Sequence, residues 1–209
     1  RVYEIGRIFR NEGISTRHNP EFTMLESYQA YADYNDMMTM VEEMVSYIVR
    51  EVLGTTEVSF GEHILKPSPP WKRITLREAI LEHCGIDFEK YPDADSLRGA
   101  IMPKLAGKNY PPGEWEGLDT MSRGKLIDKL ISTFVEPNLM QPTFVLDYPV
   151  ELSPLAKRKP GNERLVERFE VFAGSMEIAN AFTELNDPLE QRERFEQQLR
   201  EREAGDEET

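Results

Sequence analysis

Apolar and polar positions change their spacing twice within the first quarter of the chain. Residues 1–10 and 21–32 alternate with a period of two, which predicts two strands, and the loop between them favours antiparallel pairing. From Asn35, the expected N-cap, apolar residues recur at helical spacing as far as Gly54, which predicts one amphipathic helix. The apolar stripe expected to pack in the core comprises Met37, Met38, Val41, Met44, Val45, Ile48, Val49 and Val52.

The middle of the chain has mainly helical spacing. Residues 56–66 predict a short strand pair, and Thr75-Leu-Arg-Glu78 is a capping box that starts a helix ending at Cys84. Two further stretches, 94–107 and 120–136, also predict helices. This part is poor in groups of residues suited to catalysis, so we interpret it as a helical insertion.

The last third returns to strand spacing before it ends in a helix. Residues 141–149 form a short apolar run between prolines, which predicts a buried strand. Residues 166–174 and 176–185 predict a hairpin that turns at Gly174-Ser175, and Asp187-Pro188 begins a charged helix. Together the patterns predict an α+β fold with a mostly antiparallel sheet, flanking helices and a helical insertion.

These elements divide the chain into three predicted parts. Residues 1–74 contain the paired strands and the long helix, residues 75–140 the helical insertion, and residues 141–209 the remaining strands and the last helix. We expect the first and third parts to contribute two halves of one sheet, with the insertion between them.

The charge balance restricts the partners of this chain. With 38 acidic and 25 basic residues the formal net charge is −13, so this chain is not expected to provide the main binding surface for a nucleic acid. The single Cys84 cannot form an internal disulfide, which suits a reducing cytoplasm, and the apolar runs are too short to span a membrane. The chain begins with Arg1 and shows no signal peptide, which indicates a piece of a longer protein.

Candidate chemistry gathers at the end of the first predicted strand. Arg10 and Glu12 are two positions apart and therefore point to one face. Arg10 offers a planar fork of donors for a carboxylate or phosphate, and Glu12 can accept hydrogen bonds from an amine. His18 can meet a phosphate, and Phe22 can stack on a base. The group predicts a site for a small charged ligand, while the alternative is a surface hairpin whose charges are solvated.

Two polar residues follow on the same face of the second strand as Phe22. Alternation places Glu26 and Tyr28 next to each other on that face. Burying them would be costly unless something cationic met them, which indicates that the ligand carries a positive group.

Two further carboxylates flank the turn of the last predicted hairpin. Glu170 and Glu177 would repel each other if held close, unless a cation lay between them. Mg²⁺ suits such a pair, because it is a hard ion held by one or two carboxylates plus substrate phosphates. Alternation puts Asn180, Phe182 and Glu184 on one face, whereas Glu177 has the opposite parity, so a shared site requires a β-bulge or a twist. The alternative is a solvated hairpin face.

Two long stretches resemble one enzyme family. FRNEGISTRHNPEFTMLESYQAYADY is similar to motif 2 of the class II aminoacyl-tRNA synthetases, and its RNEGIS, RHNPEFTM and AYADY segments resemble the lysine enzymes in particular. RFEVFAGSMEIANAFTELND is similar to the segment before motif 3 of the same lysyl-tRNA synthetases. The resemblance covers nearly the whole chain and implies the antiparallel catalytic fold of class II.

The resemblance also implies a role for each candidate residue. Arg10 would be the catalytic arginine that bridges the carboxylate of lysine and the α-phosphate of ATP. The implied ATP-binding residues are Arg10, Glu12, His18, Asn19 and Phe22. The implied lysine-binding residues are Glu26, Tyr28, Asn180, Phe182 and Glu184, and the implied Mg²⁺ ligands are Glu170 and Glu177.

The reaction implied by the family is the activation of L-lysine by ATP to lysyl-adenylate and pyrophosphate, followed by transfer to tRNA(Lys). The family further implies a cytoplasmic homodimer without a membrane partner, which contacts tRNA through the full-length enzyme. The anticodon-binding domain, motif 1 and motif 3 have no counterpart in these 209 residues, so the isolated chain is expected to be inactive or nearly so.

Two other functions remain open from the sequence. A paralogue could make lysyl-adenylate and use it to modify a protein or a lipid, with the same site residues. A non-catalytic binding module of the same fold should have lost Arg10, Glu170 or Glu177, and all three are present. Without the resemblance, the residues predict a Mg²⁺-dependent nucleotide site but do not favour lysine over arginine or a polyamine.

Overall fold

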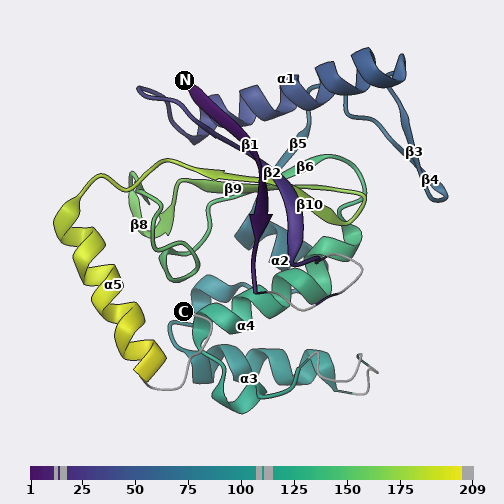
Figure 1. Cartoon of the computed structure of the whole chain (residues 1–209). Coiled ribbons are helices and arrows are strands. Elements are labelled where there is room, and N and C mark those ends of the chain that lie inside the picture. The colour runs from purple at the N-terminus through teal and green to yellow at the C-terminus, as the bar shows by residue number, and fades with distance from the viewer. Residues whose placement is uncertain (12–13, 15–17, 107–109, 111–114, 204–209) are drawn as a thin grey trace.

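A four-stranded sheet in the order β10-β9-β6-β5 forms the centre of the protein (Figure 1). The computed structural model describes residues 1–11, 14, 18–106, 110 and 115–203, and side chains only as far as residue 200. Within the sheet β5 and β6 are parallel, whereas β6 with β9 and β9 with β10 are antiparallel. The strands are β5 (Lys72–Thr75), β6 (Thr143–Leu146), β9 (Arg168–Ala173) and β10 (Met176–Phe182).

Helices cover both faces of this sheet (Figure 1). Successive residues of a strand point to opposite faces, so Phe169 and Val171 of β9 pack in one apolar cluster with helix α1, whereas Phe172 packs in a second cluster with α2, α3 and α4. The sheet is therefore buried on both sides, which explains the continuous apolar run predicted as a buried strand. The helices are α1 (Tyr34–Leu53), α2 (Leu76–Cys84), α3 (Ala94–Leu105) and α4 (Arg123–Leu130).

The helices and mostly antiparallel strands are consistent with the predicted α+β class, although not every element was predicted. The short pair β3 and β4 agrees with the expectation for residues 56–66. Strand β5 and the small hairpin β7–β8 were not predicted, because each is too short to show a period. The small elements are β3 (Val58–Phe60), β4 (His63–Leu65), β7 (Arg158–Lys159), β8 (Asn162–Val166) and the 3-10 turns Phe88–Lys90, Leu118–Thr120, Glu136–Asn138 and Val150–Leu152.

The predicted cap of α1 was wrong by two residues. Asp33, not Asn35, is the N-cap: its carboxylate accepts hydrogen bonds from the backbone N–H groups of Asn35 and Asp36. The Asp36 carboxylate in turn accepts from the N–H of Asp33 at 2.9 Å, which completes a capping box. The core prediction holds only for the first turns, where Met38 and Val41 are buried; the last two turns expose Ile48 and Val52.

The helix predicted over 120–136 is interrupted. Only Arg123–Leu130 is α-helical, and the chain continues through one π turn, Ile131–Val135, into the 3-10 turn Glu136–Asn138. Pro137 gives a physical reason, because a proline lacks the N–H that an α-helix needs and disfavours helical geometry in the residue before it.

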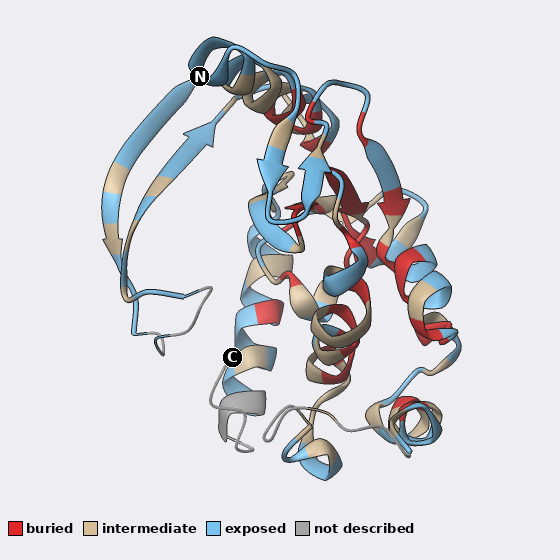
Figure 2. Cartoon of the chain, turned by 90° about the vertical axis from the view of Figure 1, so that its right-hand side faces the viewer, coloured by how far each residue is buried: buried red, intermediate tan, exposed pale blue. Residues whose placement is uncertain are grey.

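The first two strands form a ribbon of their own. β1 (Val2–Phe9) and β2 (Glu21–Tyr28) pair antiparallel, as predicted, with Ile8 opposite Phe22. The ribbon is not hydrogen-bonded into the central sheet, and most of its residues are exposed (Figure 2).

The last helix begins where the sequence predicted. α5 (Pro188–Glu203) follows Asp187, whose carboxylate accepts hydrogen bonds from the backbone N–H groups of Leu189 and Glu190. Its apolar side chains Phe195 and Leu199 are exposed, which agrees with the thin apolar stripe. Within the described ranges, α-helices that are both long and apolar enough to cross a membrane are absent.

An ion pair in the helical layer should make stability depend on acid pH. Arg77 donates two hydrogen bonds, at 2.8 and 2.7 Å, to the carboxylate of Asp87, and the guanidinium holds the pKa of Asp87 below its usual value. A lowered native pKa adds stability above the unfolded pKa of about 4, and this contribution is lost as the pH falls through the native pKa.

The variant Asp87→Asn is therefore expected to unfold at lower urea concentration than the wild type at pH 7. The difference should shrink as the pH is lowered below about 4, where Asp87 of the wild type becomes protonated. Urea unfolding of both proteins at pH 7, 4 and 2.5 measures this. A difference that stays constant over that range would show that the pair does not act through the charge of Asp87.

Candidate functional site

A β-bulge brings the two candidate metal carboxylates to one face of the sheet. The pairing of β9 with β10 shifts between Glu177 and Ala179, so that Glu177 lies opposite Phe172 and Asn180 lies opposite Glu170. Cross-strand partners share a face, so Glu170, Glu177 and Asn180 all project from the same side of the hairpin. The bulge that the sequence required for a shared site is present.

The turn of this hairpin has the geometry that its two residues favour. Gly174 and Ser175 both have positive φ, 61° and 60°, as a two-residue turn that matches the strand twist requires. A Cβ atom on Gly174 would lie 2.8 Å from the ring of Phe60, so any other residue at this position would also have to displace that ring. The turn thereby fixes the register of β9 and β10 on which the positions of Glu170 and Glu177 depend.

Glu170 is held by two side chains that sequence reasoning did not single out. The Tyr148 hydroxyl donates to Oε2 of Glu170 at 2.7 Å, and a terminal nitrogen of Arg168 donates to Oε1 at 2.5 Å. Tyr148 is 1% exposed, and the side chains of Arg168 and Glu170 are 16% and 12% exposed. Arg168 and Glu170 are two apart on one strand, a spacing that could have indicated a shared face, but the contact of Tyr148 depends on the tertiary fold.

The two carboxylates create an electrostatic demand for a cation. Burial raises the pKa of Glu170 even though Arg168 and Tyr148 act in the opposite direction. Glu177 is exposed by area, yet desolvation by the surrounding protein and the charge of Glu170 raise its pKa to about 7. Two carboxylates whose negative charges repel each other suit a hard divalent cation, whose remaining coordination positions phosphate oxygens could fill. Clusters of three or more His, Cys, Asp or Glu suited to a metal are absent from the described part of the chain.

Asn180 and Phe182 continue along the same side of β10, and Glu184 follows two residues after the strand ends, in an isolated β-bridge with Ala156. Nε of Arg168 donates to Oδ1 of Asn180 at 3.0 Å, and Phe182 packs partly buried against the cluster of the helical layer. Thr183 points to the other side, where its hydroxyl accepts a hydrogen bond from the backbone N–H of Tyr34 in α1. Glu184 therefore lies on the side of Asn180 and Phe182, and desolvation raises its pKa.

The end of the β1–β2 ribbon reaches toward the carboxylate pair. The guanidinium of Arg10 lies 5.3 Å from the ring centre of Phe22, and the backbone N–H of Arg10 donates to the carbonyl of Pro20 at 3.0 Å. The positive charge of Arg10 is near enough to lower the pKa of Glu177, against the larger effects of desolvation and Glu170. The structure thus brings a guanidinium, an aromatic ring and two carboxylates into one region.

The remaining predicted residues lie on exposed parts of the ribbon and its loop, or outside the described residues. Glu26 and Tyr28 are exposed on the ribbon, where Glu26 lies directly opposite Glu4, a third carboxylate that the sequence analysis did not name. His18 and Asn19 are exposed in the loop. Glu12 lies outside the described residues. The roles assigned to these residues stay predictions.

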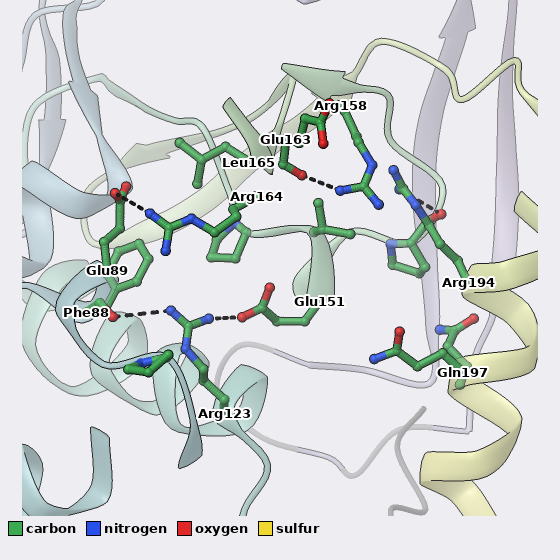
Figure 3. Close-up of a pocket in the computed structure, with 15 residues that line it drawn as sticks. Phe88, Glu89, Arg123, Glu151, Arg158, Glu163, Arg164, Leu165, Arg194 and Gln197 are labelled. Atoms are coloured by element: carbon green, nitrogen blue, oxygen red, sulfur yellow. Dashed lines mark hydrogen bonds and ion pairs between the residues drawn. The ribbon is translucent and has the colours of Figure 1, made fainter. Parts of the chain in front are cut away.

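A cleft of about 360 Å³ lies elsewhere, between α5, the β7–β8 hairpin and the helical layer (Figure 3). Four arginines line it, but each already contacts a carboxylate of the same chain. Its lining residues include none of the predicted site residues. The ion pairs are Arg123 with Glu151, Arg158 with Glu190, Arg164 with Glu89 and Arg194 with Glu190.

Comparison with known proteins identifies the family of this chain. The family model described as tRNA synthetases class II (D, K and N) matches residues 1–209, so the chain belongs to this family.

Several individual relatives within this family carry the name lysine–tRNA ligase. The chain is 56% identical over 208 residues to a lysine–tRNA ligase of Moorella thermoacetica, a match that covers 100% of the chain and 41% of the relative. It is 56% identical over 202 residues, 97% of the chain and 39% of the relative, to one of Dehalococcoides mccartyi, and 50% identical over 208 residues, 100% and 40%, to one of Bacillus subtilis. The chain therefore spans about 40% of the length of the curated relatives it matches.

Proposed function

We propose that this chain is the central catalytic part of a lysine–tRNA ligase, which activates L-lysine with ATP and transfers it to tRNA(Lys). One structural observation supports the proposal above all: the bulge in β10 places Glu170, Glu177 and Asn180 on one face of a hairpin. Activation of an amino acid brings its carboxylate next to the phosphates of ATP. It therefore needs a pair of carboxylates that can hold a divalent cation and, beside them, an amide that can bind the substrate carboxylate.

We assign the two substrates to the two sides of the region described above. ATP would be met by Arg10, Glu12, His18, Asn19 and Phe22. Lysine would be met by Glu26, Tyr28, Asn180, Phe182 and Glu184. In this assignment Glu184 pairs with the ε-ammonium group, Asn180 donates to the carboxylate, and Arg10 contacts both that carboxylate and the α-phosphate.

The residues of the chain act by positioning and charge. The carboxylate oxygen of lysine attacks the α-phosphorus of ATP in line, the bond to the β-phosphate oxygen breaks, and pyrophosphate leaves without a proton transfer. Arg10 holds the attacking carboxylate against the phosphorus and balances the charge that gathers on the phosphate oxygens. Glu170 and Glu177 are the residues that would hold Mg²⁺, which when bound would neutralise phosphate charge.

The finer fold and the partners belong to the same proposal. Residues 1–74 and 141–209 would form the class II catalytic domain, and residues 75–140 a helical insertion in it. The complete protein would be a cytoplasmic homodimer that binds tRNA(Lys) mainly through segments other than this acidic chain. A paralogue that modifies a protein or lipid, and a non-catalytic module, gain no support from the relatives described above, whose printed name is lysine–tRNA ligase.

Lysine-dependent exchange between ATP and pyrophosphate tests the proposal. The complete gene product that contains this chain is expected to catalyse exchange with lysine, and much less with arginine or ornithine, because these place their cationic group at a different distance from the backbone. The isolated 209 residues are expected to give little or no exchange. A complete product that shows no lysine-dependent exchange would contradict the proposed function.

A further inference from the structure

We infer that Arg168 is a positioning residue that sets the direction of the Asn180 amide for the carboxylate of the amino acid substrate. The inference rests on the proposed function, since it assumes that Asn180 meets a carboxylate. It concerns a residue to which neither the sequence analysis nor the assignment above gives a role. Three features of the contacts around Arg168 support it.

The first feature is the chemistry of the contact with Asn180. Nε of Arg168 is a donor only, so the amide can meet it at 3.0 Å only through its oxygen. The amide nitrogen of Asn180, with its two N–H groups, must then point away from Arg168. An amide turned in this way offers a donor to a carboxylate, whereas the opposite orientation would offer an oxygen and repel it. Arg168 therefore selects the one orientation that can bind an amino acid carboxylate.

The second feature is that Arg168 itself is held from the other side. One terminal nitrogen donates to the carbonyl of Leu152 and to the hydroxyl of Ser153, both at 2.8 Å. The guanidinium also lies over the ring of Tyr148, 4.6 Å from its centre. These groups come from the segment that follows β6, so the guanidinium plane is fixed before any ligand arrives.

The third feature is that one planar group serves two site residues together. The remaining terminal nitrogen of Arg168 donates to Glu170 at 2.5 Å, so four of the five N–H groups of the guanidinium are used. The planar fork fixes the angle between the bonds to Asn180 and Glu170. A lysine at this position would keep a positive charge for Glu170, but a single ammonium on a flexible stem could not hold both partners in that geometry.

The test is a comparison of Arg168→Lys and Arg168→Met with the wild type in ATP–pyrophosphate exchange by the complete gene product. Arg168→Lys is expected to raise the KM for lysine roughly 10- to 100-fold, the effect of losing one well-oriented hydrogen bond to a charged group. It should leave the KM for ATP and the Mg²⁺ concentration for half-maximal rate within about twofold, because the charge next to Glu170 remains. Arg168→Met should raise both the lysine KM and the Mg²⁺ requirement.

A matched control and a second variant separate positioning from folding. Arg164→Lys makes the same exchange on β8, where the side chain is 68% exposed and forms a 3.6 Å ion pair with Glu89, and it should leave all constants unchanged. Asn180→Asp keeps a partner for Arg168 but replaces the outward donor by an acceptor, so it should raise the lysine KM at least as much as Arg168→Lys. Thermal melting of every variant reports whether the fold is retained.

Each outcome decides the inference. A raised lysine KM with unchanged ATP and Mg²⁺ constants in Arg168→Lys supports it. An unchanged lysine KM, or a fall in kcat that accompanies a lower melting temperature with all KM values unchanged, overturns it and leaves the proposed function in place. A wild type without lysine-dependent exchange overturns the proposed function, and the inference with it.

Discussion

Replacing Arg194 with methionine is expected to lower the free energy of unfolding by about 3–5 kcal/mol, the usual cost of removing one partner from a buried ion pair. Arg194 is 7% exposed in the middle of α5. One of its terminal nitrogens donates to the carbonyls of Ser153, Pro154 and Ala156, at 3.2, 3.2 and 2.7 Å, and the guanidinium pairs with Glu190 at 2.5 Å. Methionine keeps the volume and helix propensity of this position but leaves those oxygens without their donor.

Urea unfolding followed by circular dichroism measures the change, and α5 supplies its own control. Arg192→Met makes the same exchange two residues earlier, where the side chain is 78% exposed and its ion pair with Glu196 spans 3.9 Å, so it should cost about 0–1 kcal/mol. Equal midpoints for the two variants would show that α5 does not depend on Arg194. The variant also tests a link between α5 and the site. The hydroxyl of Ser153 accepts a hydrogen bond from Arg168, and the carbonyl of the same residue accepts one from Arg194.

Local patterns along the chain were enough to predict the elements that position the candidate carboxylates. The alternation of residues 166–185, the Gly174-Ser175 turn and the parity of Glu177 together predicted a hairpin and the need for a bulge, and both are present. Such features depend on neighbouring residues and on turn chemistry, which a sequence displays directly.

Contacts between distant segments could not be predicted in the same way. β5 pairs in parallel with β6, so Ile74 lies next to Val145 although the helical insertion separates them in the sequence, and strands of four residues show no clear period. The choice of Asp33 over Asn35 as the cap was also beyond the pattern, because both residue types cap helices well and only the path of the preceding chain decides between them.

The arrangement around Arg168 shows the same limit within the site. Sequence reasoning named Glu170 as a candidate metal ligand, and Asn180 by its face and by the family resemblance, but it did not single out Arg168. Its importance follows from the approach of Tyr148 and Ser153, which lie 20 and 15 positions away in the chain and meet it only in the folded protein. A strand pattern indicates which face a residue occupies but not which distant groups share that face.

Replacing Glu184 with glutamine in the complete gene product is expected to reduce kcat/KM for lysine roughly 10- to 100-fold, the usual range for a hydrogen bond to a charged group. In the proposed assignment Glu184 accepts from the ε-ammonium group. Glutamine has the same length and shape, so the loss would come from charge and not from packing. Exchange assays with lysine and with norleucine, which has a methyl group in place of the aminomethyl carbon and nitrogen, measure the effect as a ratio of kcat/KM values.

That ratio separates a specific charge contact from a general defect. If Glu184 meets the ammonium group, the preference for lysine over norleucine must fall in Glu184→Gln, because only lysine loses an interaction. Glu163→Gln, an exposed glutamate on β8, is the matched control and should leave the ratio unchanged. An equal fall in kcat/KM for both substrates would show that Glu184 does not select the side chain of the amino acid. The neighbouring residue Thr183 is held by hydrogen bonds from the backbone N–H groups of Tyr34 and Lys157, so the substitution should alter the charge of the pocket without moving the backbone at this position.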